Sequence, residues 1–167
     1  YDVPHQLRLK PGVYTRQRSN GELEAQFNLS KGSNFRLSME PDSGRIHIEL
    51  GASKVPLYSV LKAMGVPETD IRRYWGEDLR DVNATKFSGK EDVNVSKIIN
   101  KLKRPNEGMP PTLEGKKQYL IDYFNNTAMD PEVNTRTLGV PASNANALAL
   151  LAASKKLIDV HKGQAEE

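Results

Sequence analysis

The sequence predicts an α+β protein in which a small antiparallel β-meander near the N-terminus packs against a helical remainder. Two observations predict this class. Apolar and polar residues alternate through the first third of the chain, and apolar residues recur at helical spacing after it. At 167 residues the chain fits one domain, strand-rich over 1–54 and helical over 55–167. Because it starts at Tyr1 and ends on charged residues, we expect a segment excised from a longer subunit.

Four strands are expected between Val13 and Leu50. Each of three stretches has apolar residues at alternate positions, so that one face is apolar and the other polar. The apolar positions are Leu23, Ala25, Phe27 and Leu29; Phe35, Leu37 and Met39; and Ile46, Ile48 and Leu50. The segments 19–21 (SNG) and 41–44 (PDSG) supply the turns between strands.

The rest of the chain is expected to be mainly helical. The expected helices are Val55–Met64, Pro67–Trp75, Val93–Leu102, one that Thr112 N-caps, and one that Ser143 or Asn144 caps and that runs to His161. Residues 78–84 could add a short turn, 86–92 break the pattern, and 125–141 are expected to be a loop. Trp75 ends its helix, so we expect it to seal an edge of the core, the alternative being a platform for a base or a partner.

The composition excludes several kinds of site. The chain has no cysteine and only three scattered histidines, so no metal site is expected. No apolar run approaches the roughly 18 residues of a membrane span, and no nucleophile, phosphate-loop or zinc-protease motif is present. We therefore expect a cytoplasmic location, no membrane partner and no catalytic residue. The net charge of +3 permits nucleic-acid contact without requiring it.

The first strand carries four basic residues at even spacing: Arg8, Lys10, Arg16 and Arg18. On one extended strand they project from the same face, where they could contact phosphate without reading sequence. The alternative is that they balance Glu22 and Glu24 across the hairpin. Those two carboxylates share a face, and we expect them to be solvated hairpin residues instead of a pair for acid/base chemistry.

The densest basic run is Lys97, Lys101, Lys103 and Arg104. It could clamp phosphate, or it could form the solvated face of a helix whose other face is apolar. Tyr119 and Tyr123 are four residues apart on a predicted helix, which is typical of a half-buried packing pair.

Four segments resemble, in the same order, segments of the β subunit of multisubunit DNA-directed RNA polymerases. They are 6–14 (QLRLKPGVY), 45–65 (RIHIELGASKVPLYSVLKAMG), 104–112 (RPNEGMPPT) and 156–166 (KLIDVHKGQAE). In the family these are a strand that leads into the lobe domain, a strand–Lys-x-Pro–helix unit, a proline-rich loop before a helix, and a helix end before a return strand. Their spread over almost the whole chain favours a lobe region of a β-type subunit.

The resemblance implies a non-catalytic part of a nucleotidyltransferase that positions downstream and non-template DNA in the cleft. By position, Lys54 matches the hinge lysine, Arg8 or Lys10 stands near the arginine before Pro-Gly-Val, and Gln6 matches a glutamine near the RNA path. These four are the expected nucleic-acid-binding residues. The implied partners are DNA, β′-type and α-type subunits, and transcription factors. The catalytic Mg²⁺ is expected in the β′-type subunit, with no cofactor in this chain.

The sequence departs from the family at two places. Glu22 stands where the family has a stacking tryptophan, and 50–54 (LGASK) replaces a cluster of arginines. Both losses argue against the family's pocket for a non-template guanine and suggest a divergent, phage-type subunit. The alternative function is a protein-docking module for transcription factors or other polymerase subunits.

Overall fold

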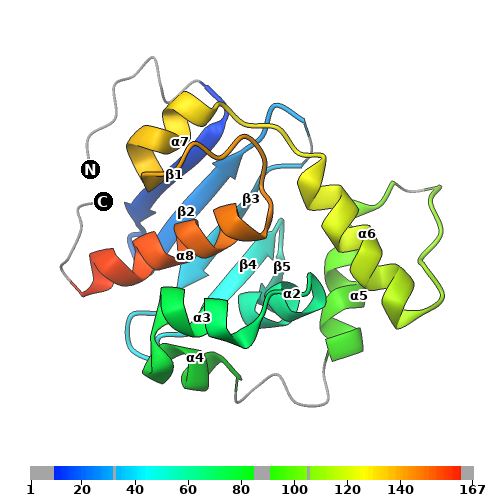
Figure 1. Ribbon diagram of the computed structural model, residues 1–167, viewed down its shortest axis with the longest axis horizontal. Helices are drawn as coiled ribbons and strands as arrows, with labels where there is room; N and C mark the ends of the chain where they lie inside the picture. Colours follow the sequence, from blue (N-terminus) through cyan, green and yellow to red (C-terminus); the bar gives the residue numbers. More distant parts are fainter. Residues whose placement is uncertain (1–9, 32, 85–90, 105, 163–167) are drawn as a thin grey trace.

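The structure, a computed structural model, describes residues 10–31, 33–84, 91–104 and 106–162, and in them an antiparallel sheet and seven helices (Figure 1). The strands lie side by side in chain order: β1 (Gly12–Gln17), β2 (Leu23–Asn28), β3 (Phe35–Met39), β4 (Ile46–Leu50) and β5 (Ser53–Pro56). The helices are α2 (Leu57–Ala63), α3 (Glu68–Trp75), α4 (Glu77–Ala84), α5 (Glu91–Leu102), α6 (Leu113–Asn125), α7 (Pro131–Leu138) and α8 (Ala147–His161). The predicted α+β class, with its N-terminal meander, is confirmed. None of the helices in these ranges is long and apolar enough to cross a membrane.

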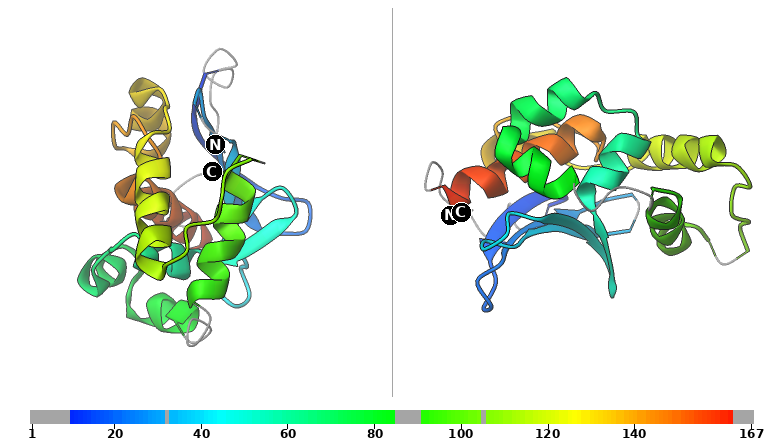
Figure 2. Two further views of the ribbon diagram at one scale, coloured as in Figure 1. Left: turned by 90° about the vertical axis from the view of Figure 1, so that its right-hand side faces the viewer. Right: turned by 90° about the horizontal axis from the view of Figure 1, so that it is seen from below.

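The strands pair in a register that gathers the apolar residues on one face. Ala25, Leu37, Ile48 and Val55 stand opposite one another across four strands, and all four are fully buried. Helix α8 packs on β2 and β3, and α2 packs on β4. In the right-hand view of Figure 2 the helices lie on one side of the sheet, so the predicted separation of an apolar and a polar face holds.

The strand–helix junction differs from the prediction, which placed the boundary at residue 55. A fifth strand occupies 53–56 and pairs with β4 through a tight turn at Gly51 (φ 59°), and the helix begins only at Leu57. Four residues are too few for apolar alternation to separate a strand from the start of a helix. Val55 would be buried both as a strand residue and as the first residue of the helix, so its apolar character could not distinguish the two.

Helix α7 lies in a region predicted to be a loop. Its start and end signals are present: Asp130 accepts a hydrogen bond from the Glu132 backbone N–H at 2.9 Å, Pro131 occupies the first turn, and Gly139 ends the helix at φ 81°. Only two apolar residues lie within its eight, so the helical periodicity was too weak to detect.

Other helix ends are confirmed or corrected by their caps. Thr112 does cap α6, accepting from the Gly115 N–H at 3.0 Å. Helix α8 is capped by Asn146, not by Ser143 or Asn144. Residues 78–84 form most of the two-turn helix α4, and 91–92 already belong to α5, while 86–90 lie outside the described residues.

Trp75 is 1% exposed and donates from its indole N–H to the Ser154 hydroxyl at 2.7 Å, so its predicted place at the core is confirmed. This bond joins α3 to α8 inside the core. The alternative of an exposed stacking platform is therefore excluded for this side chain.

Both outer strands of the sheet are capped by helices. At β1 the buried Val13 N–H donates to the side chain of Asn134 on α7 at 2.9 Å. Helix α7 can come this close because Gly12 has no side chain; a Cβ there would lie 2.5 Å from Val133. At β5 the Lys54 carbonyl accepts from the Lys97 ammonium of α5 at 3.4 Å.

We expect Asn134→Ala to lower the free energy of unfolding by about 2 kcal/mol, because it leaves the buried Val13 N–H without an acceptor. Urea denaturation measures the loss. The control is Asn100→Ala on the exposed face of α5, which should change stability by less than about 0.5 kcal/mol. Equal effects of the two changes would show that the edge of β1 does not depend on α7.

Candidate nucleic-acid interface

The face of the sheet opposite the helices carries a lattice of ion pairs. Arg18 binds Glu24 at 2.9 Å and Glu49 at 3.2 Å, and Arg36 binds Glu49 at 3.1 Å. We call the group the ion-pair lattice; its members are Arg16, Arg18, Glu22, Glu24, Arg36, Glu49 and Lys54. It holds four cations and three carboxylates, so its net charge is close to neutral.

The carboxylates in this lattice are not solvated, contrary to the prediction for Glu24. The Glu24 side chain is 3% exposed and that of Glu49 is 9% exposed, although no described helix covers this face. Both stand on interior strands, where the long side chains of neighbouring arginines lie over them. A pattern of alternation marks which face a residue occupies, but it does not show that arginines will cover that face.

Two opposing effects act on the buried carboxylates. Burial by itself would raise the pKa of Glu24, but hydrogen bonds from Arg16 and Arg18 outweigh it and hold that pKa below its ordinary value. The pKa values of Glu22 and Glu49 are lowered too, against the same effect of burial. All three therefore remain ionised at neutral pH and neutralise the arginines. Arg16 and Arg18 pair with Glu22 and Glu24, which was the alternative to phosphate contact considered for these arginines. They are therefore poor candidates for phosphate contact.

Of the four predicted nucleic-acid-binding residues, the structure describes two, Lys10 and Lys54. Gln6 and Arg8 lie outside the described residues. Lys10 precedes β1, and its ammonium lies 3.9 Å from the Asp130 carboxylate at the start of α7. Lys54 lies on β5 at the opposite edge of the sheet, 3.7 Å from Glu22. The fold therefore does not bring Lys10 and Lys54 into one site.

Lys54 instead lies beside the basic run of α5, which flanks β5 (Figure 2). Lys97 and Lys101 are exposed and lie four residues apart on one face of α5, and the exposed Arg104 follows in the loop after the helix. Within the described part of the chain, Lys97 and Lys101 make no ion pair. We call Lys54, Lys97, Lys101 and Arg104 the basic stripe. Lys54 and Lys97 are 43 residues apart in sequence. The sequence therefore showed Lys54 and the basic run of α5 as separate candidates, and no local pattern indicated that they are neighbours.

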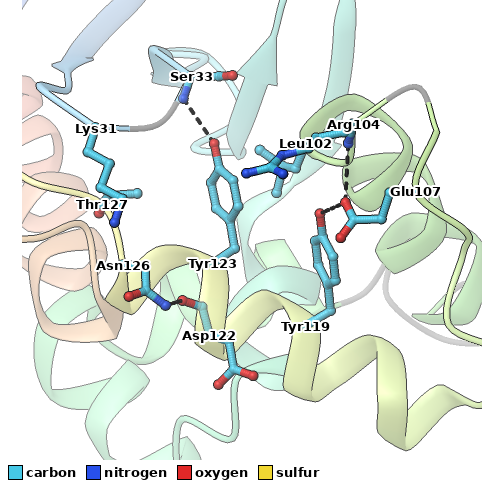
Figure 3. Close-up of a pocket in the computed structure, with 10 residues that line it drawn as sticks. All are labelled: Lys31, Ser33, Leu102, Arg104, Glu107, Tyr119, Asp122, Tyr123, Asn126 and Thr127. Atoms are coloured by element: carbon cyan, nitrogen blue, oxygen red, sulfur yellow. Dashed lines mark hydrogen bonds between the residues drawn. The ribbon is translucent and has the colours of Figure 1, made fainter.

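A cavity of about 620 Å³ lies where the basic stripe ends (Figure 3). Arg104 and Glu107 line it from the loop after α5, Lys31 from the β2–β3 connection, and Tyr119 and Tyr123 from α6. We call it the tyrosine pocket. The two rings lie 6.5 Å apart, centroid to centroid, and are nearly parallel at 11°, so the predicted packing pair is present.

The described residues contain no group of three or more His, Asp or Glu side chains arranged to hold a metal ion. The ionised carboxylates of the lattice are held by arginines and are not free to move protons. The exposed cations of the basic stripe are suited to holding an anion in place.

The lattice makes a prediction about acid stability. Because the folded-state pKa values of Glu22, Glu24 and Glu49 are lowered, their contribution is complete above the unfolded pKa of about 4.3 and is lost as pH falls through the lower folded values. Glu24→Gln should lower the free energy of unfolding by about 1.5 kcal/mol at pH 7, because the charged hydrogen bonds from Arg16 and Arg18 to Glu24 are weakened while Arg18 keeps Glu22 and Glu49. It should also flatten the loss of stability as pH falls below about 4.3, because a carboxylate with a lowered folded-state pKa is then absent.

Urea unfolding at a series of pH values measures both effects. Glu132→Gln on the exposed start of α7 is the control and should leave stability and its pH dependence nearly unchanged. An acid limb of unaltered slope in Glu24→Gln would mean that this carboxylate titrates alike in the folded and unfolded chain.

Comparison of the chain with models of known protein families finds no match, and comparison with curated proteins finds no match either.

Proposed function

We propose that this chain is the lobe region of a DNA-directed RNA polymerase β-type subunit, and that it positions DNA in the cleft through phosphate contacts. The observation that carries the proposal is the basic stripe. The Lys97 ammonium contacts the backbone carbonyl of Lys54, the hinge residue that the resemblance selects, and Lys101 continues the exposed cations toward the end of α5. The Lys54 ammonium itself lies 3.7 Å from Glu22.

The dimensions of the stripe suit a nucleic-acid backbone. From Lys97 to Lys101 the helix rises about 6 Å, since each residue adds about 1.5 Å. One strand of duplex DNA carries a phosphate about every 3.4 Å along the axis, so this length spans about two phosphates. Contacts of lysine and arginine with phosphates fix the position of a duplex but carry no sequence information.

The four family-like segments occupy positions that support the proposal. Residues 12–14 of the first segment belong to β1, and the Lys-x-Pro hinge of the 45–65 segment lies in β5 directly before α2. The 104–112 segment is the connection that ends at the cap of α6, and the 156–166 segment contains the end of α8.

In this role the chain contributes binding, and other parts of the polymerase contribute chemistry. Nucleotide addition, with its Mg²⁺, is assigned to the β′-type subunit. The nearly neutral ion-pair lattice keeps most of the sheet face from attracting DNA, so that attraction is concentrated along the edge formed by β5 and α5.

A protein-docking module is the second candidate, and one observation favours it. Val93 is 66% exposed and lies four residues before Lys97, on the same face of α5. An exposed apolar residue beside cations suits an acidic partner protein with an apolar anchor. Salt dependence separates the two candidates, because docking through an apolar anchor responds weakly to salt.

We expect the 167-residue chain to bind duplex DNA weakly, in the range of roughly 10⁻⁴ to 10⁻⁶ M. The double variant Lys97→Glu, Lys101→Glu should weaken this binding further and reduce the slope of log K against log salt by about 2, because two phosphate contacts are lost. Fluorescence anisotropy with a labelled duplex at several salt concentrations measures both quantities.

The matched control is Lys155→Glu, Lys162→Glu, which changes the net charge equally at one exposed position on α8 and one directly after it, away from α5 (Figure 1). Equal losses in the two double variants would reduce the effect to net charge and count against the basic stripe. In the assembled polymerase the stripe variant should shorten the lifetime of DNA complexes while leaving nucleotide addition on a short scaffold nearly normal. Loss of catalysis with unchanged complex lifetime would contradict a positioning role.

A further inference from the structure

The tyrosine pocket is joined to the core by a continuous series of aromatic contacts. Phe27 stacks on Phe35 at 4.5 Å, Phe35 meets Phe124 edge to face at 5.6 Å, and Tyr123 meets Phe124 edge to face at 5.5 Å. Phe27, Phe35 and Phe124 are at most 1% exposed, whereas Tyr119 and Tyr123 are half-buried. The pocket thus has a wall of partly exposed rings supported by a packed interior.

The tyrosine hydroxyls are fixed, which holds the rings in place. Tyr123 accepts a hydrogen bond from the Ser33 backbone N–H at 2.9 Å, and Tyr119 donates to the Glu107 carboxylate at 3.0 Å. Figure 3 shows both rings rising from α6 in the same direction. Burial and the bond to Glu107 raise the pKa of Tyr119 to about 12, so this ring carries no negative charge at neutral pH. A ring fixed before binding loses little conformational entropy when a ligand stacks on it.

Cations approach the rings from two sides. The Arg104 side chain extends from the end of α5 toward Tyr123, and Lys31 reaches the pocket from the β2–β3 connection (Figure 3). The pocket also contains the carboxylates of Glu107 and Asp122. These are partly engaged, since Glu107 accepts from the Arg104 N–H at 3.2 Å and Asp122 accepts from the Gln118 amide at 2.8 Å.

We propose that the tyrosine pocket binds one nucleotide unit, an unpaired base whose phosphate is held by Arg104 and Lys31. A neutral aromatic wall flanked by cations is the combination that binds single-stranded nucleic acid, because a base stacks on the ring while the cations hold the backbone. Asn126 and Asp122 on the pocket wall offer polar groups to the edge of the base. The volume of about 620 Å³ lies within the range of small-ligand pockets, about 300–1,000 Å³.

The basic stripe points to a strand as the source of this nucleotide. Arg104 belongs to both features, so a backbone that follows Lys97 and Lys101 arrives at the tyrosines. This inference rests on the proposed function and adds a preference for a single strand. A free nucleotide has the same base and phosphate but cannot contact the stripe.

The test uses the 167-residue chain and a 12-nucleotide single strand that contains 2-aminopurine, whose fluorescence is quenched on stacking. The same strand in a duplex and 2-aminopurine nucleoside monophosphate are the comparison probes. We expect quenching and tighter binding with the single strand. Tyr119→Ala should weaken that binding by about tenfold and abolish the quenching, whereas Tyr119→Phe keeps the ring and should retain both. Tyr74→Ala, at another half-buried tyrosine on α3, is the matched control.

The outcomes separate this inference from the proposed function. Unchanged quenching and affinity in Tyr119→Ala, with binding still reduced by Lys97→Glu, Lys101→Glu, would overturn the pocket and leave DNA positioning intact. If the chain binds no DNA, or if no stripe variant changes its DNA binding, the proposed function itself is wrong. Equal affinity for the free nucleotide and the strand would support the pocket but overturn the role of the stripe in filling it. Should Tyr119→Ala fail to fold, Arg104→Ala decides: it should weaken strand binding several-fold, and unaltered binding overturns the inference.

Discussion

One face of the five-stranded sheet is buried and the other is not, and the positions of the remaining elements follow from this constraint. Helices α8 and α2 cover the apolar face, while α7 and α5 lie at its two edges. The polar face has no helix over it in the described structure, so its interior strands need another source of cover. Arg16, Arg18 and Arg36 provide it, and in doing so they bury carboxylates that they must also neutralise. The arginines of the sheet are therefore committed to the fold, and the exposed cations of α5 are left for binding.

Much of this fold was predictable because its strands alternate cleanly and most helices have strong apolar stripes. The meander, the cap at Thr112 and the burial of Trp75 all followed from local patterns. Strand β5 and helix α7 did not, because the first is only four residues long and the second has too few apolar residues to show periodicity. Both are stabilised by tertiary contacts, such as the bond from Val13 to Asn134, that no local pattern contains.

The candidate site was predictable only in part, for the same reason. The basic run of α5 and the lysine of the hinge were each visible in the sequence, but their proximity depends on how α5 packs beside β5. Burial of Glu24 also depends on neighbours from other strands. The tyrosine pair was expected from its spacing of four residues. Its position beside Arg104 and Lys31 needed the packing of α5, α6 and the β2–β3 connection.

The capped edges of the sheet also bear on how the chain behaves in concentrated solution. An outer strand with free backbone groups can pair with a strand of another molecule, which is a common route to aggregation and domain swapping. Here Asn134 occupies a backbone donor of β1, and the Lys97 ammonium occupies a carbonyl of β5 while placing charge beside it. Proline at the end of β5 removes one further donor. At each end of the meander, a backbone group that strand exchange would need is thus occupied by a side chain from a distant helix.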